Sequence, residues 1–189
     1  MPRNLRDLLQ IKISLSGVDP PIWRRLLVAS STDLVEFHLI IQIAMGWTNS
    51  HPHQFTAGQQ QFGIPDNEFG DSTIPERGKR IGSLLKREAK WITYEYDFGD
   101  SWEHRITLEK ILPYRPEEAG PHCIDGRRGC PPEDVGGAWS YQEFLEAYCD
   151  QGHPDHYEKV NWIGRYYDPE RFDIDDVNRK LKGLHKAAV

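Results

Sequence analysis

The chain has 189 residues, of which 38% are hydrophobic and 11% aromatic, enough apolar material for one ordinary hydrophobic core. This composition argues against disorder, and its net charge of -6 disfavours nonspecific binding to nucleic acid, which needs clustered Lys and Arg. The longest apolar run is far too short to span a bilayer. We therefore expect a single domain over residues 1–189 and no membrane partner.

The first ten residues mix charges with leucines and lack the continuous apolar core of a secretion signal. The expected location is therefore the cytoplasm. The three cysteines are an odd set, and in a reducing compartment they are expected to be free thiols or metal ligands rather than a disulfide framework.

Two strands are predicted near the N-terminus. Apolar and polar residues alternate over residues 11–15, which is the period of a half-buried strand. After an Asp-Pro-Pro turn, a second strand is expected over residues 22–28. Arg24 and Arg25 are neighbours in this strand and must point to opposite faces, so at least one of them is expected to face solvent.

The next segment gives the clearest helix prediction. Asp33 and Glu36 have the spacing of a capping box, apolar residues recur at helical spacing through Met45, and Gly46 is placed to end the helix. Residues 62–80 are rich in Gly, Pro and acidic residues and are expected to form a long loop. A short helix is predicted over residues 81–88.

A β-hairpin is predicted from residues 91–98 and 101–112 around a Gly-Asp turn. If its loop has an odd number of residues, the apolar side chains of both strands share one face: Ile92, Tyr94, Tyr96, Phe98, Trp102, His104, Ile106 and Leu108. A two-residue loop would mix apolar and polar residues on both faces, so the odd loop is preferred. The imidazole of His104 would then need a polar partner or an ion on the apolar face.

Two more histidines could join His104. If a strand begins at His51, then His51 and His53 point to the same face. Three inward histidines are a ligand set that leaves a position for water on a catalytic zinc, and Asp97 or Asp100 could act as a further ligand or as a base. Structural histidines with satisfied hydrogen bonds are the competing interpretation.

Residues 123–137 combine thiols, carboxylates, prolines and glycines. Cys123 and Cys130 are farther apart than the usual cysteine pairs of structural zinc sites. Glu133 and Asp134 lie between a Pro-Pro and a Gly-Gly pair, which specifies the shape of the loop. These carboxylates could bind a cation, accept a hydrogen bond from a helix amide or pair with an arginine, or the segment could be a rigid connector.

Two helices are predicted in the C-terminal third. The first opens at the capping-box pattern of Ser140 and Glu143 and runs through Tyr148, and the last covers residues 175–184. The sequence contains no phosphate-binding P-loop, no nucleophile elbow and no His-Glu-x-x-His helix, which removes support for several large enzyme classes.

An ordered set of motifs runs along the chain: Ile-Trp-Arg-Arg at 22–25, Gly-Trp at 46–47, His-Pro-His-Gln-Phe at 51–55, residues 94–104, residues 123–137 and Tyr141. As a set, over about residues 9–181, these motifs closely resemble the plasmid ORF-three-like family, named from a root-inducing plasmid. The resemblance implies an α+β fold, a single compact domain with a mixed or antiparallel sheet in a roll-like arrangement with several packed helices. Members are often described as plasmid-borne or transposon-associated, and some carry a resolvase label, but this sequence has no convincing recombinase site.

The first functional hypothesis is a cytoplasmic binding or accessory domain, associated with plasmid or transposon biology, whose partner is a protein or a small ligand. The alternative is a metal-dependent hydrolase acting on phosphodiesters. In that reading the three histidines would bind a divalent metal such as zinc, Asp100 would orient water, and Arg24 or Arg25 would stabilise developing negative charge.

The candidate functional surface joins charged, aromatic and thiol side chains of these segments. Its members are Arg24, Arg25, Asp97, Asp100, Trp102, Cys123, Asp125, Arg127, Cys130, Glu133 and Asp134, and the candidate metal ligands are His51, His53 and His104. No residue is assigned a catalytic role by the sequence.

Direct nucleic-acid binding is a third hypothesis. Between Arg77 and Lys90 lie six basic residues that are opposed only by Glu88, so this segment could contact an anionic partner. A solvated helix face is the alternative interpretation, and the net charge of the chain disfavours the nucleic-acid reading.

Overall fold

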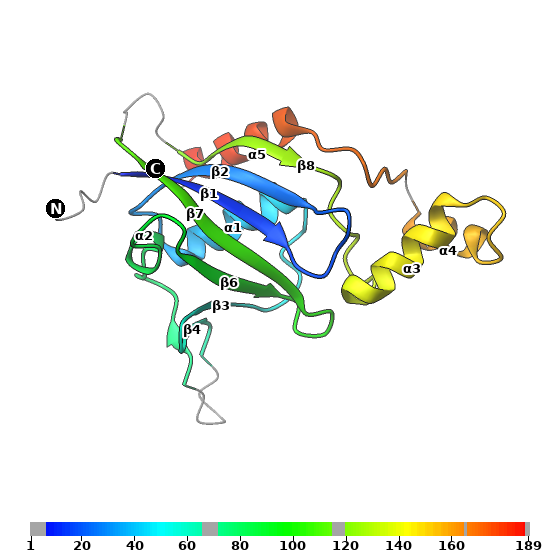
Figure 1. Cartoon of the computed structure of the whole chain (residues 1–189), viewed down its shortest axis with the longest axis horizontal. Helices are drawn as coiled ribbons and strands as arrows, with labels where there is room; N and C mark the ends of the chain where they lie inside the picture. Colours follow the sequence, from blue (N-terminus) through cyan, green and yellow to red (C-terminus); the bar gives the residue numbers. More distant parts are fainter. Residues whose placement is uncertain (1–6, 66–71, 115–119, 165, 188–189) are drawn as a thin grey trace.

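The computed structural model describes residues 7–65, 72–114, 120–164 and 166–187. Eight strands in these ranges form one open sheet in the order β5-β4-β3-β6-β7-β1-β2-β8 (Figure 1). Their bounds are β1 (Leu8–Leu15), β2 (Trp23–Ala29), β3 (His53–Ala57), β4 (Gln60–Gly63), β5 (Ile74–Pro75), β6 (Trp91–Tyr96), β7 (Trp102–Leu112) and β8 (His122–Arg127). The pairing is antiparallel except between β4 and β5, so the sheet is mixed.

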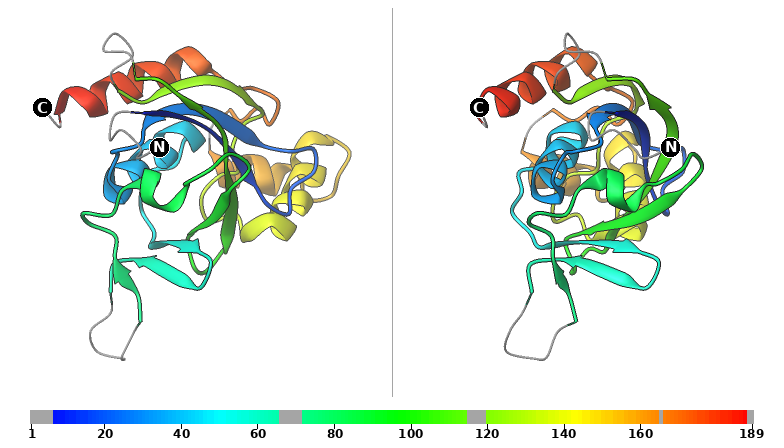
Figure 2. Two further views of the ribbon diagram at one scale, coloured as in Figure 1. Left: turned by 60° about the vertical axis from the view of Figure 1, so that its left-hand side comes forward. Right: turned by 90° about the vertical axis from the view of Figure 1, so that its left-hand side faces the viewer.

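Five helices lie within the described residues: α1 (Leu34–Met45), α2 (Ile81–Leu84), α3 (Gly137–Cys149), α4 (His156–Ile163) and α5 (Ile174–Ala187). Helix α1 covers one face of the sheet, α5 packs against β8 and α1, and α3 and α4 extend from one end of the sheet (Figures 1 and 2). None of these helices is long and apolar enough to cross a bilayer. The single sheet and the helices that pack with it form one α+β domain, as predicted.

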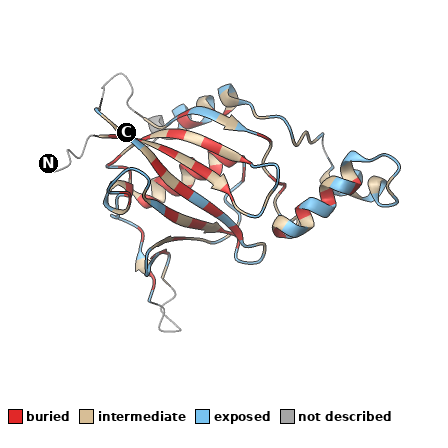
Figure 3. Cartoon of the chain, in the orientation of Figure 1, coloured by how far each residue is buried: buried red, intermediate tan, exposed pale blue. Residues whose placement is uncertain are grey.

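The core lies between α1 and the sheet. Alternate residues of the central strands point toward α1, and Figure 3 shows the resulting buried bands along each strand. Each fully buried Leu, Ile or Phe side chain contributes about 1.5–3 kcal/mol. The strand residues of this core are Leu9, Ile11, Ile13, Leu26, Val28, Phe55, Ile92, Tyr94, Tyr96, Ile106 and Leu108. The opposite face is mostly polar and is more exposed to solvent.

The predicted ends of α1 are confirmed. The side chain of Asp33 accepts a hydrogen bond from the Val35 amide at 3.0 Å. Gly46 adopts a left-handed conformation with φ of 95°, and its amide donates to the Gln42 carbonyl at 2.8 Å.

The predicted odd hairpin loop is also confirmed. Strand β6 ends at Tyr96 and β7 begins at Trp102, which leaves a five-residue turn, and Tyr94 pairs with His104. His104 is fully buried, as the register required. Phe98, which was predicted on the apolar face, instead lies in the turn and is 50% exposed, because the strand alternation stops at the positive φ of Asp97.

Several predicted boundaries are wrong. Helix α2 ends at Leu84 rather than at residue 88. Helix α3 begins at Gly137, and its N-cap is Gly136 without a side-chain bond, so the Ser140 capping box does not form. The predicted loop over residues 62–80 contains the end of β4 and the short β5, while its residues 66–71 lie outside the described ranges. Strand β8 and helix α4 were not predicted.

Candidate functional site

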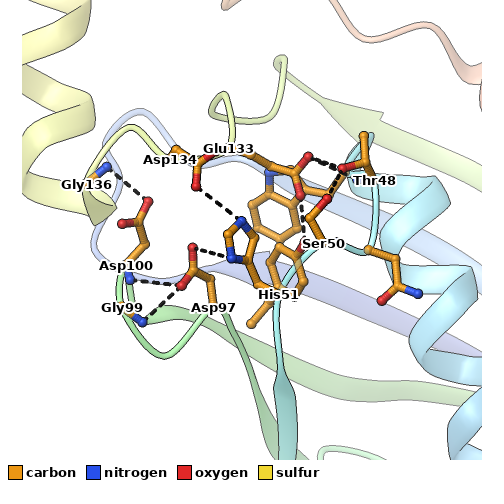
Figure 4. Close-up of polar contacts among 12 residues, drawn as sticks. Thr48, Ser50, His51, Asp97, Gly99, Asp100, Glu133, Asp134 and Gly136 are labelled. Atoms are coloured by element: carbon orange, nitrogen blue, oxygen red, sulfur yellow. Dashed lines mark hydrogen bonds and ion pairs between the residues drawn. The ribbon is translucent and has the colours of Figure 1, made fainter.

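Three loops meet at the end of the sheet beside α3 (Figures 1 and 4). They are the α1–β3 connection at residues 46–52, the hairpin turn at 97–101, and the β8–α3 connection at 128–136. The indole nitrogen of Trp47 donates to the Pro131 carbonyl at 3.0 Å, which joins the first loop to the third. The site is built from side chains of all three loops.

His51 lies between two carboxylates in this cluster (Figure 4). Its Nε2 is 3.2 Å from Oδ1 of Asp134, and its Nδ1 is 3.5 Å from Oδ2 of Asp97. One ligand atom from each of the three residues can be chosen so that all lie within 4.8 Å of one another. Within the described ranges this is the single group of three or more His, Cys, Asp or Glu residues with the spacing of a metal site.

Asp97 shapes the hairpin turn as well as facing His51. Its Oδ1 accepts hydrogen bonds from the amides of Gly99 at 2.9 Å and Asp100 at 3.3 Å. Its own amide donates to the Pro52 carbonyl at 2.9 Å, which fixes the turn against the start of β3. One carboxylate oxygen therefore holds the turn, and the other, Oδ2, is directed at the imidazole.

Glu133 joins the third loop to the other two. Its Oε1 accepts from the Tyr96 hydroxyl at 2.6 Å, and its Oε2 accepts from the amide and the hydroxyl of Thr48 at 3.2 and 2.5 Å. Burial and the hydrogen bond to Glu133 raise the pKa of Tyr96 above its usual range, so the hydroxyl keeps its proton. Glu133 thus acts as a structural link next to the His51 group.

The start of α3 is fixed to the hairpin turn. Asp100 Oδ2 accepts a hydrogen bond from the Gly136 amide at 3.0 Å. Gly137 has φ of 81°, and a Cβ there would lie 2.5 Å from the Asp100 carbonyl oxygen. Only glycine permits this close approach, which sets the position of Asp134 relative to the turn.

Backbone strain is concentrated in the same loops. Asn49, Asp97, Ser101 and Asp134 have φ values between 52° and 62°. Non-glycine residues adopt this conformation at a cost of about 1–3 kcal/mol each, and such strain tends to collect at functional sites. The contacts among the three loops hold these residues in place.

A buried polar network holds the α1–β3 connection, the loop that carries His51. His38 Nδ1 lies 2.8 Å from the Tyr94 hydroxyl, and its Nε2 lies 2.6 Å from Oδ1 of Asn49, two residues before His51. The side-chain oxygen of Gln42 accepts from the Asn49 amide at 2.9 Å. Burial lowers the pKa of His38 to about 4, so the ring is neutral at pH 7. Sequence reasoning missed His38, whose signal is a histidine within the apolar stripe of α1.

The other two candidate metal-ligand histidines occupy different surroundings. His53 Nε2 bonds to Oε2 of the buried Glu76 at 2.9 Å, and its ring stacks on His38 with a centroid distance of 3.5 Å. His104 packs edge-on against Trp47 in the core. In the described part of the chain, His53 and His104 form no ligand group with His51. The predicted convergence of the three histidines is not observed, and of the three only His51 faces Asp97 and Asp134.

His104 gives the fold a pH dependence. Its Nδ1 donates to the carbonyls of Trp102 and Tyr94 at 3.0 and 3.3 Å, and its buried Nε2 has no partner among the described residues. Burial therefore lowers its pKa from 6.5 to about 4. Between about pH 4 and pH 6.5, His104 is protonated in the unfolded chain but not in the folded one. Its contribution to the free energy of unfolding is therefore fully present above about pH 6.5. Below that pH the contribution falls by up to about 1.4 kcal/mol per pH unit until about pH 4.

We expect His104→Asn to reduce this pH dependence. Asparagine keeps a donor near the position of Nδ1 but does not titrate, so the dependence that remains comes from His38 and the acidic groups. Urea unfolding of wild type and variant across the acid range measures the effect. If wild type and His104→Asn lost the same free energy of unfolding on acidification, His104 would not contribute to the pH dependence as predicted.

Both arginines of the predicted surface lie away from the cluster. Arg24 is buried and donates to the carbonyls of Ala44, Trp23 and Arg127. Arg25 lies on the opposite face of the sheet and pairs with Glu109 at 2.7 Å and Asp125 at 2.9 Å. The predicted opposite orientation is confirmed, and neither side chain is placed to stabilise charge at His51.

Among the described residues, the remaining predicted ones are not part of the His51, Asp97 and Asp134 group. Trp102 is buried in the core, and Arg127 is exposed on β8. Cys123 and Cys130 are free thiols. Burial raises the pKa of Cys123 to about 11 and that of Cys130 to about 12, so both thiols stay protonated. The basic segment at 77–90 surrounds α2, at the opposite end of the sheet (Figure 1).

The chain is similar to known proteins over most of its length. Residues 7–176 match the family model described as plasmid pRiA4b ORF-3-like protein. The uncharacterized protein y4hQ of Sinorhizobium fredii (strain NBRC 101917 / NGR234) is 40% identical over 180 residues, covering 94% of this chain and 92% of that protein. The crystal structure of MM3350, a protein of unknown function from Methanosarcina mazei Go1, superimposes with a TM-score of 0.81 at 33% identity, covering 92% of this chain and 98% of that one.

Proposed function

We propose that this chain, which belongs to the plasmid pRiA4b ORF-3-like family, is a binding domain that holds a divalent cation at His51, Asp97 and Asp134. The observation that carries the proposal is the convergence of one imidazole and two carboxylates from three separate loops, with ligand atoms within 4.8 Å of one another. The competing interpretation is that His51 only makes direct contacts with these two carboxylates and holds no ion between them.

The donor set suits a cation such as zinc or manganese. An imidazole nitrogen with two carboxylate oxygens is a mixed set that both ions accept, and two carboxylates neutralise the charge of a divalent ion. Three protein ligands leave further coordination positions for water or a ligand. The Asp134 side chain is 72% exposed, so the site is open to solvent on that side.

Calorimetric titration with Zn²⁺ and with Mn²⁺ tests this proposal. We expect one site per chain, and we expect His51→Ala to weaken binding at least about 100-fold, because loss of a ligand should cost at least as much as loss of a residue that orients one. His122→Ala is the matched control, since His122 is exposed on β8 away from the cluster. Equal affinity in wild type and His51→Ala would rule out the proposed ligand set.

Metal-dependent hydrolysis of phosphodiesters is the second candidate. The Asp100 carboxylate, on the same turn as Asp97, favours it as a group that would orient a metal-activated water. This candidate ranks second because Arg24 and Arg25 lie away from the site. Neither arginine is placed to stabilise the negative charge that develops during hydrolysis. Turnover of an aryl phosphodiester with added Mn²⁺, abolished by Asp100→Asn while cation binding persists, would establish it. Absence of turnover in cation-loaded wild type would reject the hydrolase and leave cation binding as the proposed function.

An association with plasmid or transposon biology is the last part of the proposal. It is supported by the plasmid in the description of the matching family. Placement of the gene beside replication or transposition genes across related genomes would test it, and random placement would count against it.

A further inference from the structure

The hairpin of α3 and α4 leaves a helix face uncovered. Helix α4 extends away from the sheet with α3 and contains no buried side chain (Figures 1 and 3). Trp162 on α4 is 47% exposed and Val160 is 38% exposed. Surface helices normally bury such apolar side chains against a neighbour, so this face has the character of an interaction surface.

A groove of about 720 Å³ runs between the two helices and the β8–α3 loop. Apolar side chains line it from both sides: Val135, Phe144, Ala147 and Trp162. The Trp162 ring packs edge-on against Phe144, with centroids 5.6 Å apart, so it forms part of a fixed wall. An apolar side chain of a partner would find an ordered aromatic surface here.

The rim of this α3–α4 groove is acidic. Glu143, Glu146, Asp155 and Glu158 all line it. Lys159 is the one lysine or arginine among the lining residues, and its Nζ lies 3.3 Å from Glu158. Within the ranges that the structure describes, no lysine or arginine pairs with the other three carboxylates.

We propose that the α3–α4 groove docks a basic segment of a partner protein, one that carries Lys or Arg side chains beside apolar ones. The apolar residues contact Trp162 and Phe144, while the cations meet the carboxylates of the rim and the exposed aromatic faces. Asp134 also lines this groove, so a docked segment would lie next to the proposed cation site, and docking does not depend on the cation.

Fluorescence anisotropy with a labelled amphipathic peptide made of Lys and Leu tests the docking surface. We expect saturable binding that weakens with added NaCl and is absent for a peptide with Glu in place of Lys. The double variant Glu146→Lys/Glu158→Lys is expected to weaken binding by at least about tenfold, because it reverses two charges of the rim. Trp162→Ala is expected to weaken it by a similar factor through lost apolar contact.

Matched variants separate docking from general attraction to an acidic protein. Glu95→Lys/Glu103→Lys makes the same charge change on the outer face of the sheet, and Tyr157→Ala removes an exposed aromatic of α4 that does not line the groove. Both should stay within about twofold of wild type. Equal losses in the two charge-reversal variants, or no peptide binding by wild type, would overturn the proposal. Salt-sensitive self-association without peptide binding would replace the partner with a second copy of the chain.

Discussion

Arg24→Ala is expected to lower the free energy of unfolding by about 3–5 kcal/mol, among the largest effects of any single substitution in this chain. The Arg24 Nε donates to the Ala44 carbonyl at the end of α1, and its Nη1 donates to the carbonyls of Trp23 and Arg127. Its guanidinium also lies over the Phe172 ring, 4.0 Å from the centroid. The side chain therefore ties α1, β2 and the end of β8 together.

The expected loss has two physical sources. Truncation removes the Arg24 donor from the buried bond to Ala44 and from two partly buried bonds, at about 1–3 kcal/mol each where water cannot replace the bond. It also leaves a cavity under Phe172. Sequence reasoning treated Arg24 as a functional residue, whereas its contacts make it a structural one.

The neighbouring arginine is the matched control. Arg25 is partly exposed and pairs with Glu109 and Asp125 on the solvent face, so Arg25→Ala is expected to cost only about 1 kcal/mol or less. Urea unfolding of both variants measures the difference. Similar losses for the two arginines would contradict the role assigned to Arg24.

Asp97→Asn is expected to weaken divalent-cation binding at least about 100-fold while costing about 1 kcal/mol or less in stability. Asparagine tolerates the left-handed φ of 60° and retains an oxygen that can accept from the Gly99 and Asp100 amides. It removes only the charge that faces His51. Affinity by calorimetry and stability by urea unfolding would be measured on the same preparations.

Asp97→Ala separates the two functions of the carboxylate. It should lose cation affinity equally, and it should also destabilise the fold by about 2–4 kcal/mol, because the turn loses its acceptor and alanine must adopt a positive φ. Asp150→Asn is the control for the chemical change, since Asp150 caps another turn by accepting from the Gly152 amide. Undiminished cation affinity in Asp97→Asn would remove Asp97 from the ligand set.

The sequence predicted the elements whose residues follow one local pattern. The apolar stripe of α1 with its Asp33 and Gly46 ends, and the face of the β6–β7 hairpin, both depend on neighbouring residues along the chain. The early start of α3 was set by a contact between distant segments. The Gly136 amide binds Asp100, and this contact has no trace in the local sequence.

The candidate site was predicted in parts and grouped wrongly. His51, Asp97 and Asp134 were each identified from residue type, but strand periodicity grouped His51 with His53 and His104. The structure places His51 before β3 begins, so the alternation of strand side chains does not apply to it. Which side chains of three loops converge depends on the path of the loops, and that path is fixed by long-range bonds such as that between Glu133 and Tyr96.

The most direct test of the cation site is anomalous diffraction from crystals of the protein soaked in Mn²⁺. The proposed site predicts a single strong peak within coordination distance of His51, Asp97 and Asp134, with that peak absent in His51→Ala crystals. A well-ordered loop cluster without a peak, or a peak held by other residues, would contradict it.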